Sequence, residues 1–128
     1  MTAPRYSESE LWQKVRSMCE TKHPFFSGKR GNKYVVDSVD EAAKEYSVRY
    51  ESGNLKRIPL RDLYAVYVEL YELGSMPRDY LKDPANGERL VGHTRYSHAP
   101  GATLFAILPA LDDRIQAGEG GRLSLSPA

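Results

Sequence analysis

"EYSVRYESGNLKRIPLRDLYAVYVELYELG", residues 45–74, contains the change of hydrophobic period that decides the fold. In its first part Tyr46, Val48 and Tyr50 alternate with polar residues, and a period of two is typical of a strand with one buried face. The tight-turn signal SGN at 52–54 follows, so the chain is expected to return as a further strand over "LKRIPL".

The second part, "RDLYAVYVELYELG", changes to a helical pattern. Apolar or aromatic residues fill most positions, and only Asp62, Glu69 and Glu72 remain to face water. Such a narrow polar strip is typical of a helix packed on more than one side, and Gly74 is suited to ending it. We therefore expect a central helix over 61–73 that meets the buried face of the sheet.

The residues before this stretch add a strand and an N-terminal helix. "KYVVDSV" has strand character, which makes a short antiparallel meander of three strands over about 33–60. "HPFFSGKRGNK", residues 23–33, is interrupted by proline and glycine and is expected to be a loop. Apolar residues recur at helical intervals over 8–22, and Ser7 with Glu10 has the spacing of a capping box.

The residues after the central helix are expected to form short helices and loops. "SMPRDYL" is typical of a helical turn with Ser75 as its N-cap, and "KDPANGER" of a loop. A further apolar helical face follows at Leu104, Leu108, Leu111 and Ile115. Pro109 interrupts this face, so we expect a kink or two consecutive helices, the second starting at Pro109. Residues 118–128 are small and polar and are expected to be a flexible tail.

Together these elements predict one α+β domain over 1–117, with an N-terminal helix, a small three-stranded antiparallel meander and two to three C-terminal helices packed on the sheet. A chain of 128 residues that is 41% hydrophobic and 27% charged has the size and composition of one soluble globular domain. No apolar run is long enough for a membrane helix, and the first residues lack the apolar core of a secretory signal. We therefore expect a cytoplasmic protein that does not bind a membrane.

The net charge of +1 favours no particular partner, but the charges are segregated along the chain. Residues 22–61 hold nine Lys or Arg against five Asp or Glu, a local +4, whereas residues 62–90 hold three against six, a local −3. Cations neutralise phosphates and exposed aromatic rings stack on unpaired bases, so the basic half has the composition of a surface for nucleic acid or another polyanion. The predicted surface consists of Lys29, Arg30, Lys33, Arg49, Lys56, Arg57 and Arg61, with the aromatic residues Phe26 and Tyr50. The alternative is that the aromatic residues pack in the core and the charges only solvate the surface.

A second hypothesis is a protein-interaction module or a homodimer that uses the acidic, tyrosine-rich helix. The chain has nine tyrosines, and tyrosine is favoured at interfaces because it joins a large apolar body to a hydroxyl. A basic half beside an acidic half also favours association. The residues expected at this interface are Tyr64, Glu72 and Tyr80, and the alternative is plain packing of aromatic rings in the core.

A third hypothesis concerns residues 93–103, where polar side chains precede a helix expected to begin near Pro100. Free backbone N–H groups at a helix start attract anions, so a secondary anion or small-molecule site is predicted here. Its residues are Arg95, Ser97, His98 and Gly101. The spacing matches neither a P-loop nor a dinucleotide fingerprint, and the alternative is a solvated loop before a helix.

No catalytic residue, metal site or cofactor is predicted. Cys19 lies on the apolar stripe of the first helix, where we expect a small buried hydrophobe rather than a nucleophile. His93 and His98 lack further ligands at the spacing of a zinc site. Asp112 and Asp113 are adjacent on a helix, so they point apart and are expected only to solvate it. We therefore expect a binding protein rather than an enzyme.

Overall fold

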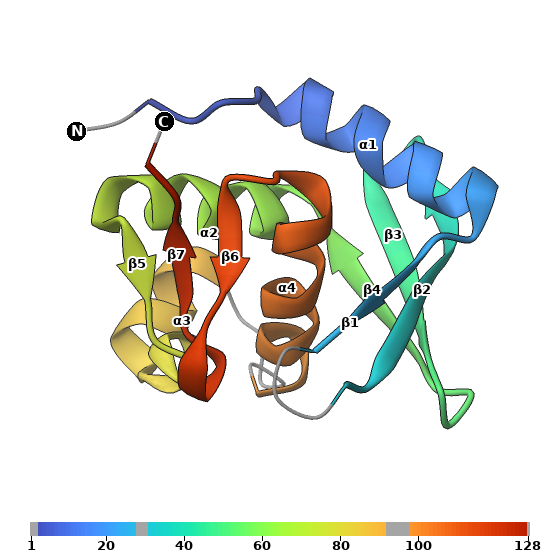
Figure 1. Cartoon of the computed structure of the whole chain (residues 1–128). Coiled ribbons are helices and arrows are strands. Elements are labelled where there is room, and N and C mark those ends of the chain that lie inside the picture. The colour runs from blue at the N-terminus through green and yellow to red at the C-terminus, as the bar shows by residue number, and fades with distance from the viewer. Residues whose placement is uncertain (1–2, 28–30, 92–97, 128) are drawn as a thin grey trace.

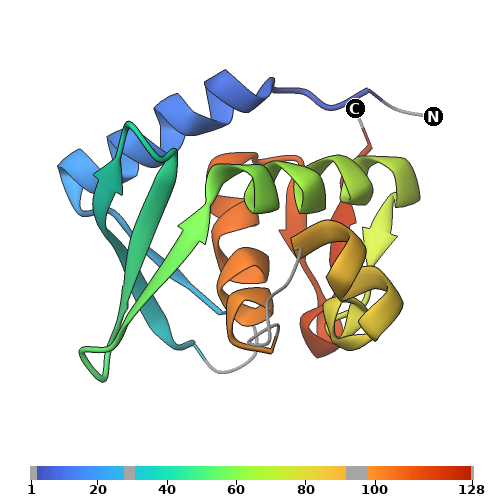
Figure 2. The same ribbon diagram turned by 180° about the vertical axis from the view of Figure 1, so that it is seen from behind.

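The computed structural model of the chain describes residues 3–27, 31–91 and 98–127. The predicted α+β class is confirmed, with four α-helices and two antiparallel sheets in these residues (Figure 1). Helix α4 (His98–Leu111) runs through the middle, with the larger sheet on one side and the smaller sheet on the other in both views (Figures 1 and 2). None of the described helices is both long and apolar enough to cross a membrane.

Helix α1 (Glu8–Thr21) confirms the predicted N-terminal helix and its cap. The Ser7 hydroxyl accepts a hydrogen bond from the Glu10 N–H at 3.2 Å, and the Glu10 carboxylate accepts one from the Ser7 N–H at 2.9 Å. These two bonds satisfy backbone donors that a helix start otherwise leaves open. The helix buries its apolar stripe, which consists of Leu11, Trp12, Val15 and Met18.

The larger sheet has four antiparallel strands in chain order, rather than the three that were predicted. The predicted meander is formed by β2 (Lys33–Asp40), β3 (Glu45–Tyr50) and β4 (Leu55–Pro59). The additional strand, β1 (Pro24–Phe26), lies in the segment that was predicted to be a loop. It forms because Phe25 buries its ring 5.5 Å from the ring of Tyr34, and because an edge strand tolerates the missing N–H of its proline.

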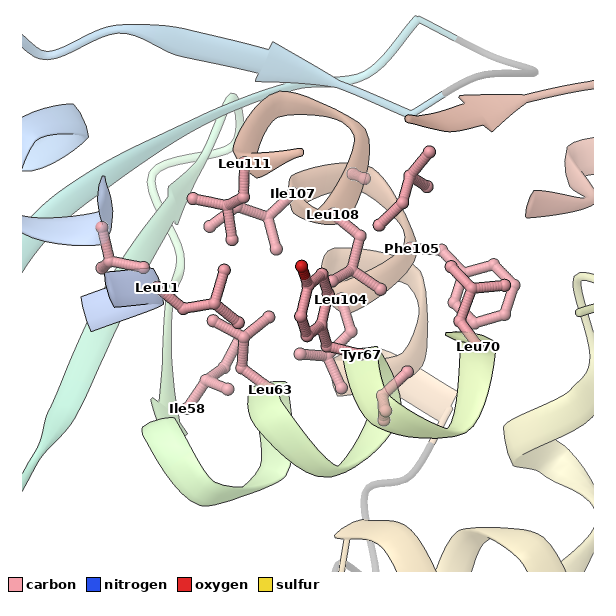
Figure 3. Close-up of a cluster of buried hydrophobic side chains, with 14 of the residues drawn as sticks. Leu11, Ile58, Leu63, Tyr67, Leu70, Leu104, Phe105, Ile107, Leu108 and Leu111 are labelled. Atoms are coloured by element: carbon pink, nitrogen blue, oxygen red, sulfur yellow. The ribbon is translucent and has the colours of Figure 1, made fainter. Parts of the chain in front are cut away.

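Helix α2 (Leu60–Leu73) is the predicted central helix. Gly74 ends it at φ 80° and donates its N–H to the Leu70 carbonyl oxygen at 2.8 Å, a conformation that glycine adopts without strain. Figure 3 shows Leu63, Tyr67 and Leu70 of α2 gathered with the apolar side chains of α4. All three are fully buried, so the contact between α2 and α4 forms the centre of the core.

The segment after α2 differs from its prediction. Ser75 does not cap a helical turn, because Ser75–Met76 is strand β5 and a 3₁₀ helix, η1, follows at Tyr80–Lys82. The predicted loop "KDPANGER" contains most of helix α3 (Pro84–Val91). The Asp83 carboxylate accepts a hydrogen bond from the Ala85 N–H at 3.0 Å, directly before a proline at the first helical position. Both features are signals of a helix start.

The C-terminal residues belong to the fold. Helix α4 continues through Pro109 to Leu111, so it is one helix rather than two, and the missing donor affects only its last turn. The chain then forms β6 (Ile115–Ala117), the 3₁₀ helix η2 (Glu119–Gly121) and β7 (Leu123–Leu125). Strand β7 is the middle strand of the smaller sheet, between β5 and β6, and Leu123 is buried. The expected tail over 118–128 thus contains a central strand.

Candidate nucleic-acid interface

The register of the larger sheet places twelve paired residues on the face that points away from the core. Residues directly opposite each other in antiparallel strands share a face, and alternate residues along one strand share it too. Lys33 lies opposite Phe26, Arg49 lies between Val35 and Leu55, and Arg57 lies opposite Ser47. We call this set the outer face, and it consists of Pro24, Phe26, Lys33, Val35, Ser38, Asp40, Glu45, Ser47, Arg49, Leu55, Arg57 and Pro59. None of these side chains is buried.

The outer face combines cations with exposed apolar groups. Phe26 is 54% exposed and Leu55 is 50% exposed, which places both among the most exposed large apolar side chains of the described chain. Lys33, the direct neighbour of Phe26, is also exposed. An apolar side chain that is exposed to solvent does not pack in the core. Exposed apolar groups next to cations are common on protein surfaces that bind nucleic acid.

Two of the cations on the outer face have carboxylate neighbours. Arg49 Nε lies 3.0 Å from an oxygen of Asp37, and Arg57 Nε lies 3.7 Å from an oxygen of Glu45. The side chains of Arg49 and Arg57 are 49% and 73% exposed, and ion pairs in contact with solvent contribute only about 0 to 1 kcal/mol. A phosphate can therefore replace the carboxylate at little cost. The carboxylates of Asp37, Asp40 and Glu45 nevertheless balance the charges of Lys33, Arg49 and Arg57, so the face has no net positive charge.

Several residues of the predicted surface lie elsewhere. Lys56 is opposite Val48, so it belongs to the other face of the sheet from Arg57. Tyr50 also points toward the helices, and its hydroxyl lies 2.7 Å from the hydroxyl of Thr103 on α4. Burial at this position raises the pKa of the Tyr50 phenol. Arg61 is exposed in the first turn of α2, beside Asp62.

Two other groups of candidate residues fall partly or wholly outside the described residues. Lys29 and Arg30 of the predicted basic surface lie outside the described residues. So do Arg95 and Ser97 of the predicted anion site. His98 and Gly101 contribute their backbone to the first turns of α4, and their side chains are also outside the description.

Two of the three residues predicted for a protein interface, Tyr64 and Tyr80, are partly buried. Tyr64 is half-buried, with its ring 6.1 Å from that of Tyr67. Tyr80 donates its hydroxyl to Glu69, which also accepts two hydrogen bonds from the Arg89 guanidinium. The bonds from Arg89 and then Tyr80 outweigh burial and hold the pKa of Glu69 below its usual value. Tyr80 therefore helps to join α3 to α2, and of the three predicted residues only Glu72 is fully exposed.

A buried carboxylate that the sequence does not indicate joins three parts of the chain. Asp112, which was expected only to solvate a helix, is 1% exposed. Its carboxylate accepts hydrogen bonds from the hydroxyls of Tyr71 at 2.6 Å and Tyr67 at 2.8 Å, and from the Arg114 N–H at 3.0 Å. Burial alone would raise its pKa, but these bonds and the charge of Arg5 outweigh it and hold the pKa below the usual value. Both oxygens of this carboxylate accept hydrogen bonds from protein donors, so the cluster stabilises the fold.

No group of three or more His, Cys, Asp or Glu side chains in the part of the chain that the structure describes could hold a metal ion. Comparison with protein-family models, curated proteins and solved structures finds no match to this chain. Its function must therefore be inferred from its own residues and their arrangement.

Proposed function

We propose that this protein is a non-enzymatic binding domain that contacts nucleic acid with unpaired bases through the outer face. The observation that carries this proposal is the register of β1–β4, which aligns cations and exposed apolar groups on one uncovered face. In this role Lys33, Arg49 and Arg57 neutralise phosphates. Phe26 supplies a ring on which a base stacks, and Leu55 contacts a neighbouring base or sugar.

The arrangement of the cations suits a strand that crosses the sheet. Arg49 on β3 lies directly opposite Leu55 on β4. Arg57 is two residues after Leu55 on the same strand, so Arg49 and Arg57 are diagonal neighbours. Diagonal neighbours in a sheet are separated by about 7 to 8 Å, within reach of successive phosphates for side chains as long as arginine. Because arginine donates in a fixed fork, each can hold a phosphate through two hydrogen bonds.

The salt dependence of binding tests the proposal. Three phosphate contacts to a single strand predict a slope of about −2 in a plot of log affinity against log salt, or a loss of more than about tenfold between 50 and 200 mM. A fluorescence anisotropy titration with a labelled, mixed-sequence single strand measures this slope. Absence of binding at the lower salt concentration would contradict the proposal.

Variants of the same protein localise the binding. The double variant Arg49→Gln and Arg57→Gln removes two phosphate contacts and is expected to weaken binding by more than about tenfold and to reduce the slope by about 1.4. The single variant Arg49→Gln, which removes one contact and one charge, has its matched control in Arg16→Gln, because Arg16 on α1 also lies beside a carboxylate, that of Glu41. An equal loss in the control would mean that only total charge matters. Light scattering on the same samples would show a dimer if the tyrosine-rich helix instead drives association.

A further inference from the structure

A pocket of about 530 Å³ opens at one end of the outer face. It lies between the first turns of α1, the turn that joins β2 to β3, and the start of α2. Glu45 and Pro59, which form the pair next to Ser47 and Arg57 in the sheet, line it. The pocket and the outer face are therefore continuous, and the volume is within the range of small-ligand sites.

The inside of the pocket has an apolar wall and charged groups of both signs. The apolar wall is formed by the half-buried Pro59 and by the edges of two core side chains, Trp12 and Leu60, which are 3% and 5% exposed. Glu8 has no ion-pair partner among the described residues, and Glu45 has only the distant contact with Arg57. On the cationic side, the Arg61 side chain is 81% exposed. A ligand that fits all three features has N–H donors for the carboxylates, a flat apolar body and an anionic group.

The pocket walls are held by bonds that do not use Glu8, Glu45 or Arg61, and the contacts of Glu45 with Arg57 and of Arg61 with Asp62 are long, at 3.7 Å each. The Leu60 N–H donates to the Lys44 carbonyl oxygen at 2.8 Å, which fixes the start of α2 to the β2–β3 turn. The Trp12 indole N–H donates to both oxygens of Glu41, at 2.9 and 3.0 Å. The Lys44 ammonium lies 5.4 Å from the centre of the Trp12 ring. Glu8, Glu45 and Arg61 can therefore engage a ligand while these bonds stay in place.

We propose that this pocket binds a single nucleotide whose base carries an exocyclic amino group, either as a free nucleoside monophosphate or as the end of a strand on the outer face. Glu8 and Glu45 accept hydrogen bonds from the amino group, as carboxylates do from cytosine. Arg61 holds the phosphate, and the base contacts the apolar wall. The choice of a nucleotide over another ligand of this shape rests on the proposed function, because the pocket continues the face assigned to nucleic acid.

Trp12 is the only tryptophan of the chain, so its fluorescence reports on this pocket. Titration of the intact protein with AMP is expected to change the emission in a saturable way. IMP, which has an oxo group in place of the amino group, is expected to bind about tenfold more weakly, and adenosine also more weakly because it lacks the phosphate. No saturable change with AMP, equal affinity for AMP and IMP, or tighter binding of phenylalanine than of AMP would overturn the proposal.

Two carboxylate variants test the location. Glu8→Gln is expected to weaken AMP binding by about tenfold, the loss typical of one hydrogen bond to a charged group. Glu20→Gln, at the exposed far end of the same helix, is expected to leave it unchanged. Equal loss in both variants, or no loss in either, would contradict a site at this pocket.

Competition separates the pocket from the outer face. If AMP displaces a strand that ends in adenylate, the pocket holds the end of that strand, and if both bind together the pocket takes the free nucleotide. Binding of AMP without binding of any oligonucleotide would support the pocket and contradict the proposed function. Binding of oligonucleotides without any response to AMP would contradict the pocket alone.

Discussion

Tyr46 brings a hydroxyl into the core, where the described chain offers it no hydrogen-bond partner. The side chain is 1% exposed, and burial together with the nearby Asp62 carboxylate raises the pKa of the phenol. The ring fills space in the core, whereas the hydroxyl has lost its hydration without compensation. Ring and hydroxyl therefore act on stability in opposite directions.

Replacement of Tyr46 by Phe keeps the ring and removes the unpaired hydroxyl. We expect the free energy of unfolding, measured by urea denaturation, to stay constant or to rise by about 1 kcal/mol. Tyr67→Phe is the contrasting variant, because the Tyr67 hydroxyl donates to Asp112 and accepts from the Tyr6 N–H. It is expected to lose about 1 to 2 kcal/mol. A similar loss in Tyr46→Phe would show that this hydroxyl does have a partner.

Asp112 and its neighbour Asp113 provide a second comparison of single residues. Asp112→Ala leaves the buried hydroxyls of Tyr67 and Tyr71 without their acceptor and is expected to cost about 3 kcal/mol or more. Asp113→Ala removes a side chain that is 86% exposed and is expected to cost less than about 0.5 kcal/mol. Urea denaturation measures both, and equal effects would contradict the assigned role of Asp112.

The same carboxylate predicts a pH dependence. The folded-state pKa of Asp112 is lowered, so its contribution to stability is present above the unfolded-state pKa of about 3.9 and is lost as the pH falls through the folded-state value. The difference in stability between the wild type and Asp112→Ala should therefore be constant from about pH 5 to 7 and shrink below about pH 4. A difference that stays constant well below pH 3 would contradict this assignment.

At the scale of elements, length determines which elements the sequence predicts. Strands β2, β3 and β4 have five or more residues each, enough to show their alternation, and α1 and α2 have 14 residues each. Strands β1 and β5 have three and two residues, too few to show a period. Strand β5 forms because β7, near the end of the described chain, pairs with it, and β1 forms because its pairing with β2 buries Phe25 against Tyr34. Neither short segment shows this in its own sequence pattern. The start of α3 is different, because Asp83 before Pro84 was a readable signal.

Strand β7 leads to a prediction about truncation. Deletion of residues 118–128 removes the middle strand of the smaller sheet and the buried Leu123, whose side chain alone is expected to contribute about 2 to 3 kcal/mol. We therefore expect a clear fall in the thermal midpoint, measured by circular dichroism. Deletion of residues 127 and 128 alone is the control and should leave the midpoint unchanged. A truncated chain as stable as the whole one would contradict the packing of β7.

At the scale of the whole molecule, strand alternation predicts part of the outer face and tertiary packing decides the rest. Arg49 and Arg57 on one face and Lys56 on the other follow from the alternation of β3 and β4. The inward position of Tyr50 follows from the same alternation, but its bond to Thr103 depends on where α4 packs. The carboxylates beside the arginines depend on the strand register and on the bulge in β2 between Val36 and Ser38. No hydrophobic pattern within a single segment of the sequence predicts these contacts.

The measurement that tests the central claim most directly is a map of backbone amide shifts, by nuclear magnetic resonance, on addition of a short mixed-sequence single strand. At 14.4 kDa the protein is well suited to this method. Binding through the outer face predicts that the largest shifts fall on β1–β4, at Phe26, Lys33, Arg49, Leu55 and Arg57. Shifts confined to α2 and α3, or no shifts at low salt, would contradict it.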